Sequence, residues 1–168
     1  SSGIGPGMEP EPSELHDYWE KNTIYRDSSE TLAERIDAMA ALPMFEEPGT
    51  QWRYGWSADV LARVVEVVAQ QPYGEFVQQR ILIPLGMTST SYLAADGLPQ
   101  GTATIYTQDE DGDLVVSAPR FDAYWTPGGS GLISTAEDFM RFALMLWNRG
   151  EYQGVRLLQA VSVNEMTR

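Results

Sequence analysis

The 168-residue sequence contains no cysteine, a single histidine (His16) and a single lysine (Lys21). Without cysteine, the chain cannot form a disulfide, use a thiolate nucleophile or hold zinc through sulfur. With one histidine, it cannot build a metal site from several histidines, and a Ser-His-Asp triad could use only His16. Because His16 lies in a stretch rich in Pro and Glu with no matched partner, we expect a surface histidine. We predict no metal and no cofactor.

Basic side chains are also scarce, because 11 Lys and Arg stand against 24 Asp and Glu, which gives a formal charge of −13. Nucleic acids and anionic membranes carry negative charge, so the sequence argues against both as partners. No apolar run approaches the ~20 residues of a membrane span, and no secretory leader stands at the start. The hydrophobic share of 43% and the charged share of 21% are typical of a globular chain with a core.

The apolar pattern predicts a mostly helical domain over residues 27–168, preceded by an irregular segment over residues 1–26 that is rich in Gly, Pro and Glu. A helix is expected to start at Asp27–Glu30, where an acceptor is followed three residues later by a carboxylate, and to stop at Pro43. The strongest helix is expected over residues 57–71. Its broad apolar face should be central to the core and consists of Val60, Leu61, Val64, Val65 and Val68.

Further along, residues 73–87 predict a helix closed by Pro84 and Gly86. Residues 102–116 predict one β-hairpin that turns at Asp111-Gly112. After a loop over residues 118–131, a capping box at Ser134–Glu137 is expected to start a helix that ends at Gly150. The predicted buried face of that helix contains Phe139, Phe142, Ala143 and Leu146. A short extended piece over residues 154–158 and a last helical segment over residues 158–167 are expected to finish the chain.

Two other motifs favour ordinary loops. The GGSG stretch at Gly128–Gly131 looks like a nucleophile elbow, but Leu132 follows where the second glycine should fall, and the serine precedes the helix start by several residues. We interpret this stretch as a loop that needs unusual backbone angles. The acidic runs at Asp109–Asp113 and Glu46-Glu47 lack the spacing of a calcium-binding EF-hand and are expected to be solvated loops.

Tyr54 stands just before the predicted helix start at Ser57. The positive end of a helix dipole stabilises a phenolate, and a nearby ammonium group would lower the pKa of the tyrosine further. Tyr54 could then act as a base. A Tyr/Trp cluster that only packs is the more common explanation of such a stretch, and the residues alone favour it without excluding the catalytic one.

Nearly the whole chain resembles serine β-lactamase-like hydrolases, which include class C β-lactamases, D,D-peptidases and family VIII carboxylesterases. The matching stretches occur in the same order and with similar spacing. They are PGT at 48–50, YGW at 54–56, the DVL-x-RVVEVV helix, YGEFVQQRILIPLGMTSTSY, the hairpin, GGSGLISTAEDFMRFALMLWNRG and GVRLLQAVSVNEMT. The resemblance implies the helical domain of that α/β fold, mainly α with a small β-hairpin, without most of the sheet domain.

The family's mechanism uses a Ser-x-x-Lys nucleophile, a Tyr-x-Asn-like motif and a Lys-Thr-Gly-like strand. Tyr54 falls on the tyrosine of the second motif, so the resemblance implies that it is the general base or proton relay. Trp56 replaces the asparagine of that motif, and because an indole can only donate one N–H, this change favours an esterase. No serine here has lysine three residues later, since Tyr18 stands at that offset before Lys21, and the third motif is absent.

The resemblance therefore implies the central fragment of a serine hydrolase, most simply a carboxylesterase that cleaves small-molecule esters through an acyl-enzyme. Alone, the fragment should be inactive. Trp56 and Trp125 are expected to line the acyl or alcohol pocket, although packing is the simpler role for Trp125. A β-lactamase or D,D-peptidase fragment and a non-catalytic binding module on the same scaffold remain as alternatives.

The fragment hypothesis has two further consequences. Apolar surface should be exposed where the sheet domain belongs, so we expect a complementary sheet-domain segment as partner, or self-association. The natural N-terminus is expected to lie outside this fragment. The missing leader, which favours the cytoplasm, therefore leaves the compartment open.

Overall fold

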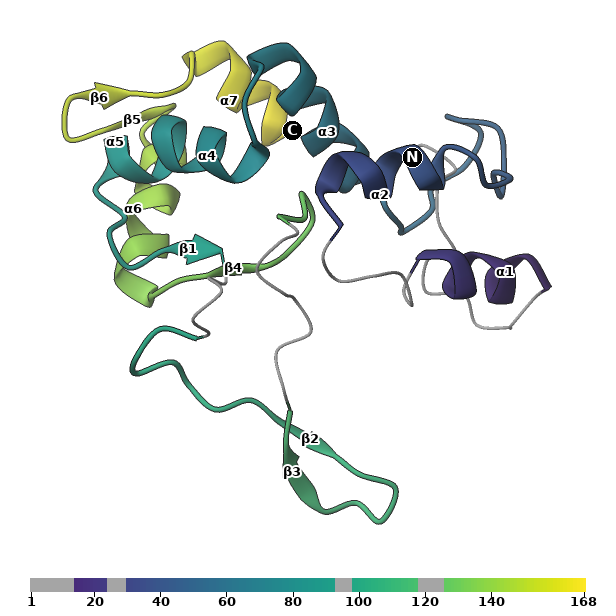
Figure 1. Ribbon diagram of the computed structural model, residues 1–168. Helices are drawn as coiled ribbons and strands as arrows, with labels where there is room; N and C mark the ends of the chain where they lie inside the picture. The colour runs from purple at the N-terminus through teal and green to yellow at the C-terminus, as the bar shows by residue number, and fades with distance from the viewer. Residues whose placement is uncertain (1–13, 24–29, 93–97, 118–125) are drawn as a thin grey trace. The chain divides into compact units, whose positions relative to one another are not determined.

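The computed structural model describes residues 14–23, 30–92, 98–117 and 126–168 (Figure 1). The chain forms two compact units, one from residues 1–60 and 93–131 and the other from residues 61–92 and 132–168. The helices are α1 (Glu14–Thr23), α2 (Leu32–Met39), α3 (Ser57–Ala69), α4 (Tyr73–Val77), α5 (Ile83–Leu85), α6 (Ala136–Trp147) and α7 (Ala160–Met166).

The strands are short and pair only in twos. They are β1 (Ser91–Tyr92), β2 (Tyr106–Gln108), β3 (Leu114–Val116), β4 (Leu132–Ile133), β5 (Glu151–Tyr152) and β6 (Val155–Arg156). β1 pairs with β4, β2 with β3 and β5 with β6, all antiparallel. The mainly helical class is confirmed, as is the hairpin within residues 102–116. The prediction of a single hairpin is wrong, because β5 and β6 form a second one and β1 and β4 a third pair.

Helix α1 corrects the prediction that residues 1–26 are irregular throughout. Glu14 and Asp17 in its first turn and Lys21 in its last complement the helix dipole. Trp19 is fully buried, its indole N–H donates to the carbonyl of Pro43 (2.8 Å), and its ring centroid lies 6.0 Å from that of Phe45. The sequence pattern could not show this helix, because its main packing partners lie in the loop after α2. His16 lies on α1 and is half-buried.

Helix α2 begins one residue after Thr31, not at the predicted Asp27–Glu30 signal, whose first three residues lie outside the described part of the chain. The Thr31 hydroxyl accepts the N–H of Glu34 (3.3 Å), and the Glu34 carboxylate accepts the N–H of Thr31 (2.8 Å). The Thr31 hydroxyl also donates to this carboxylate (2.8 Å). The hydrogen bonds from the Thr31 N–H and hydroxyl hold the pKa of Glu34 below its ordinary value. The capping logic was correct, but the box lies four residues further on.

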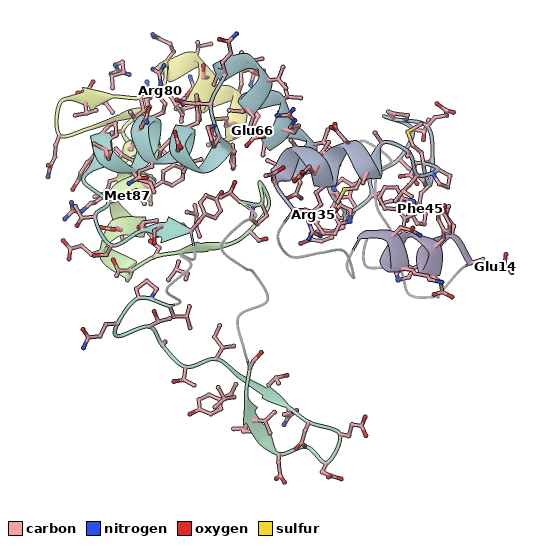
Figure 2. All side chains as sticks on the ribbon, in the orientation of Figure 1. Glu14, Arg35, Phe45, Glu66, Arg80 and Met87 are labelled. Carbon is pink, nitrogen blue, oxygen red and sulfur yellow. The ribbon has the colours of Figure 1, made fainter. Side chains whose placement is uncertain are left out.

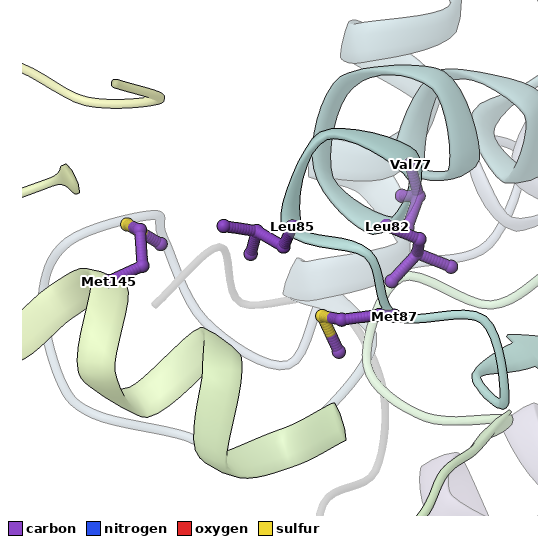
Figure 3. Packing of buried hydrophobic residues seen from close by; sticks show 5 residues of the cluster. All are labelled: Val77, Leu82, Leu85, Met87 and Met145. Carbon is purple, nitrogen blue, oxygen red and sulfur yellow. The ribbon is translucent and has the colours of Figure 1, made fainter. Parts of the chain in front are cut away.

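In the second unit, the core lies between the α4–α5 segment and α6 (Figure 3). It consists of Val77, Leu82, Leu85, Met87 and Met145. The predicted helix over 73–87 is interrupted by a π-helical turn at Gln78–Leu82, where the N–H of Ile83 donates to the carbonyl of Gln78. Pro84 has no N–H and crowds the preceding turn, which favours this wider spacing. Gly86 then ends the helix with a φ of 66°, as predicted.

The turn between α3 and α4 is closed by Glu66, which Figure 2 labels. The Glu66 carboxylate accepts the backbone N–H of Tyr73 (2.9 Å) and pairs with Arg63 one turn earlier (3.1 Å). This carboxylate therefore sets where α4 begins.

Helix α6 is capped by Thr135, whose hydroxyl accepts the N–H of Asp138 (3.2 Å), one residue later than the predicted box. Its buried residue in the core is Met145, which the sequence prediction did not include. Phe142 and Leu146 are partly buried against that core, as expected, but Phe139 is exposed, so that prediction was wrong. The core occupies a narrower strip of α6 than the apolar pattern suggested.

Helix α3 also departs from the prediction. Leu61, Val64 and Val68 are exposed, whereas Ala62 and Asp59 are buried. Val60 and Val65 are half-buried. The expectation that the predicted face is central to the core is therefore wrong for Leu61, Val64 and Val68, which the described residues leave exposed. In the part of the chain that the structure describes, no helix has the length and apolarity of a membrane span.

Candidate functional site

The candidate site is built around the start of α3. The carbonyl of Trp56 accepts the N–H groups of Asp59 (3.1 Å) and Val60 (3.0 Å), so the helix begins directly after the Tyr54-Gly55-Trp56 segment. The side chain of Tyr54 is 59% exposed, and Trp56 is half-buried. Tyr54 is therefore a largely exposed residue that lies three positions before the first residue of α3.

The backbone just before Tyr54 is held by Arg53. Its Nε donates to the Glu46 carboxylate (2.6 Å), and its guanidinium carbon lies 4.7 Å from the ring centroid of Phe45. Phe45 in turn packs against Trp19. The prediction that Glu46 belongs to a solvated loop is wrong, because the ion pair with Arg53 largely buries its side chain. The segment that carries Tyr54 is therefore anchored to the aromatic core of its unit.

The GGSG loop reaches the first turn of α3 through Asp59. The N–H of Gly128 donates to Oδ1 of Asp59 (3.0 Å), and Pro127 beside it is fully buried. A Cβ on Gly129 would lie only 3.4 Å from Cβ of Ala58 and 3.7 Å from Oδ2 of Asp59, so the loop backbone packs directly on the helix.

The Asp59 carboxyl is 5% exposed, and burial raises its pKa above the ordinary value. The backbone N–H groups of Gly128, Gly129 and Asp59 itself oppose that rise. A carboxylate that is buried but met by several N–H donors is a fixed attachment point for a loop.

The structure brings three sequence-predicted features together at this end of α3: Tyr54, Trp56 and the GGSG loop. Trp125 lies outside the described residues. Ser130 is exposed on the loop and precedes strand β4, so it does not lie on the strand-to-helix turn of an elbow nucleophile. Among the residues that the structure describes, no cluster of three or more His, Asp or Glu side chains could hold a metal ion.

Sequence reasoning missed Arg53, Glu46 and Asp59. Arg53 pairs with Glu46 across a loop, and Asp59 accepts a hydrogen bond from Gly128, 69 residues further along the chain. A local sequence pattern does not identify partners at such separations. The one available signal was the carboxylate of Asp59 in the first turn of an otherwise apolar helix.

A role for Tyr54 as a base would set two requirements on its surroundings. A tyrosine that acts as a base needs the reacting hydroxyl within hydrogen-bond reach and a neighbouring cation that favours the phenolate. The single lysine, Lys21, lies on α1, and Tyr18 occupies the place of the serine in a Ser-x-x-Lys motif.

Comparisons with known proteins agree on one family. The family model described as "Beta-lactamase" matches residues 1–168. The protein Rv1367c of Mycobacterium tuberculosis is 35% identical over 135 residues, which cover 78% of this chain and 34% of that protein. The esterase EstB of Burkholderia gladioli is 29% identical over 128 residues, which cover 66% of this chain and 33% of that protein.

A solved structure gives the same result for the fold. The penicillin-binding protein from Bacillus halodurans superposes with a TM-score of 0.73 at 25% identity, over 99% of this chain and 49% of that one. The chain spans about a third of the length of the curated relatives it matches.

Proposed function

The chain belongs to the beta-lactamase family, whose members are serine hydrolases, and from this premise we propose that it forms the tyrosine-bearing helical part of a carboxylesterase. The observation that carries the proposal is the placement of Tyr54. Tyr54 is exposed and lies three residues before α3 begins, and the ion pair of Arg53 with Glu46 holds the residue just before it. These features support a proton relay, because its oxygen must be accessible and a held backbone limits where that oxygen can lie.

In the proposed reaction, a serine outside this chain attacks the carbonyl carbon of a small-molecule ester. Tyr54 Oη accepts the serine proton as the bond forms and delivers it to the leaving alcohol oxygen when the ester bond breaks. Water then attacks the acyl carbonyl carbon, and the same oxygen accepts a proton from that water. It returns this proton to the serine oxygen as the acyl–serine bond breaks and the carboxylic acid leaves. The serine and its lysine partner would come from a segment that is not part of these 168 residues, so the chain alone should be inactive.

Trp56 supports an ester rather than a β-lactam or a peptide as substrate. The indole offers one N–H donor and no acceptor, so it cannot satisfy a substrate amide as an asparagine side chain would. An ester has no N–H group and loses nothing by this replacement. The similarity to EstB, which is named as an esterase, points in the same direction.

Two alternatives are kept. The similarity to a penicillin-binding protein favours a β-lactamase or D,D-peptidase. A non-catalytic binding module would have kept the same scaffold and lost the nucleophile, and it is retained because no serine within these 168 residues has lysine three positions later.

The test uses active enzyme in which this chain is joined to the segment that supplies Ser-x-x-Lys. Tyr54→Phe should lower kcat for p-nitrophenyl butyrate by roughly 10²- to 10⁴-fold, the usual contribution of general acid–base catalysis. Tyr106→Phe is the matched control, because Tyr106 is 57% exposed and lies in the β2–β3 hairpin. Full activity of the Tyr54→Phe enzyme would rule the proposal out.

Substrate class is decided in the same enzyme by comparing p-nitrophenyl esters with nitrocefin. We expect ester hydrolysis to dominate, and Trp56→Asn to raise nitrocefin turnover relative to ester turnover. Dominant nitrocefin hydrolysis by the unmodified enzyme would favour the β-lactamase alternative. Hydrolysis of neither substrate, together with ligand binding, would favour the binding module.

A further inference from the structure

The Gly128–Gly131 loop is tied to α3 by a buried charge. Asp59 lies in the first turn of the helix and accepts the N–H of Gly128, which lies 69 residues further along the chain (3.0 Å). A carboxylate that only complements the helix dipole can do so from the surface, where it stays hydrated. Asp59 instead is 5% exposed and bears the cost of desolvation, so its burial calls for another explanation.

The contacts of the loop supply that explanation. Pro127 is fully buried, Gly128 donates to Oδ1 of Asp59, and the backbone of Gly129 lies against Ala58 and Oδ2 of Asp59. The contacts of Gly128 and Gly129 both involve the first turn of α3. Tyr54 lies three residues before that turn, a separation of at most about 11 Å along an extended chain. The loop is therefore attached at the end of α3 where Tyr54 lies.

We propose that Asp59 is a positioning residue, whose carboxylate holds the loop over residues 126–131 at the Tyr54 end of α3 so that the loop forms one wall of the pocket for the acyl group of the ester. The proposal rests on the proposed esterase function and extends it to substrate recognition. Asp59 does not touch the reacting atoms. Its effect passes through the loop backbone, so it should determine how well the substrate binds rather than how fast the bond breaks.

Asp138 offers a matched control elsewhere in the chain. It is 3% exposed, lies in the first turn of α6, and accepts the N–H of Ser89 (2.8 Å) and the hydroxyl of Thr90 (2.9 Å). It is the same device in the other unit, a buried carboxylate at a helix start that holds a distant segment. It has no described contact with the loop or with Tyr54.

The kinetic experiment uses the active enzyme and p-nitrophenyl esters. Asp59→Ala should raise KM about tenfold, the effect of losing one buried hydrogen-bond acceptor, and should leave kcat within about twofold. Asp59→Asn keeps one acceptor oxygen for Gly128 and should give an intermediate KM. Simple loss of folded enzyme would lower the apparent kcat at unchanged KM, and that is the pattern expected for Asp138→Asn.

A second measurement tests the attachment of the loop even if Asp59→Ala folds poorly. Amide hydrogen exchange on the 168-residue chain should be faster at Gly128 and Gly129 in Asp59→Asn than in the unmodified chain, and unchanged in α6. Unchanged exchange at these glycines would overturn the attachment. Faster exchange at an unchanged KM would overturn the role in the pocket.

The two proposals fail separately. If Tyr54→Phe lowers kcat while Asp59→Ala and Asp59→Asn leave KM unchanged, the esterase function stands and the loop is not a pocket wall. If Tyr54→Phe retains full activity, the proposed function fails and the pocket role fails with it. The exchange experiment still decides whether Asp59 holds the loop.

Discussion

Met145 gives the sharpest test of the core in the second unit. It is 1% exposed and lies on α6 against Val77, Leu82, Leu85 and Met87. Truncation to alanine removes the buried side chain beyond Cβ and leaves a cavity that the surrounding helices fill only in part. Buried Met→Ala changes of this kind cost about 2–5 kcal/mol of folding free energy.

Met140 provides the control within the same helix, because its side chain is 56% exposed. Met140→Ala should change the free energy of unfolding by less than about 0.5 kcal/mol. Both variants replace methionine by alanine inside α6, so the small gain in helix propensity is common to both and cancels in the comparison. The difference between them therefore reports burial alone.

Urea unfolding followed by circular dichroism measures the difference. With a slope of about 2 kcal/mol per molar urea, a loss of ~3 kcal/mol lowers the midpoint by about 1.5 M. Met145→Leu, which nearly conserves volume, should recover most of the loss. Equal midpoints for Met145→Ala and Met140→Ala would show that α6 is not packed on the α4–α5 segment as described.

Three further predictions concern other parts of the chain. Gly150 and Gly154 have left-handed φ angles of 93° and 81°, respectively. A Cβ at Gly150 would overlap the carbonyl of Leu158, whereas a Cβ at Gly154 would meet no atom within 4 Å. Gly150→Ala should therefore lower the Tm well beyond Gly154→Ala, and equal Tm values would contradict this. Because burial raises the pKa of Asp59, the folded state holds this proton more tightly, and stability from this group falls as pH rises from about 3.9 to the raised folded value. The difference in unfolding free energy, Asp59→Asn minus the unmodified chain, should therefore increase with pH in that window. Urea titrations at several pH values measure this difference, and a constant difference would refute the prediction. The exposed Leu61, Val64 and Val68 should make the chain self-associate and bind an apolar dye, and Val64→Ser with Val68→Ser should weaken both; a strictly monomeric, dye-silent chain in sedimentation would argue against this.

Local signals predicted most of the elements. The Gly112 turn between β2 and β3, the left-handed Gly86 and the Thr135 cap each depend on residues within a few positions, so a short stretch of sequence contains the information. Even there, the caps of α2 and α6 differ from the prediction by one to four residues. Several hydroxyl and carboxylate side chains stand close together at both helix starts, and only the backbone geometry selects one of them.

Burial was the part that local signals could not supply. Periodicity identifies an apolar face on α3 but not what covers it, and the described residues leave that face open. Trp19 is the reverse case, because it is buried although the sequence pattern predicts no helix around it. Its indole N–H donates to a carbonyl 24 residues further along the chain, and a local pattern does not contain that partner. The same limit applies to the candidate site. Tyr54 became a candidate through its place just before a helix start and through the family resemblance. Asp59 resembles any acidic residue in a first turn until the position of Gly128 is known.

The exposed face of α3 bears directly on the proposed chemistry. Leu61 lies four residues after the helix start, which is about 6 Å along the axis, so the open apolar face begins close to the end where Tyr54 lies. Proton transfer requires the reacting serine within about 3 Å of the phenol oxygen. A segment that buries the exposed side chains of α3 would gain apolar contact. In the active enzyme we therefore expect Leu61, Val64 and Val68 to be less accessible to solvent than in the 168-residue chain, and equal accessibility would contradict this.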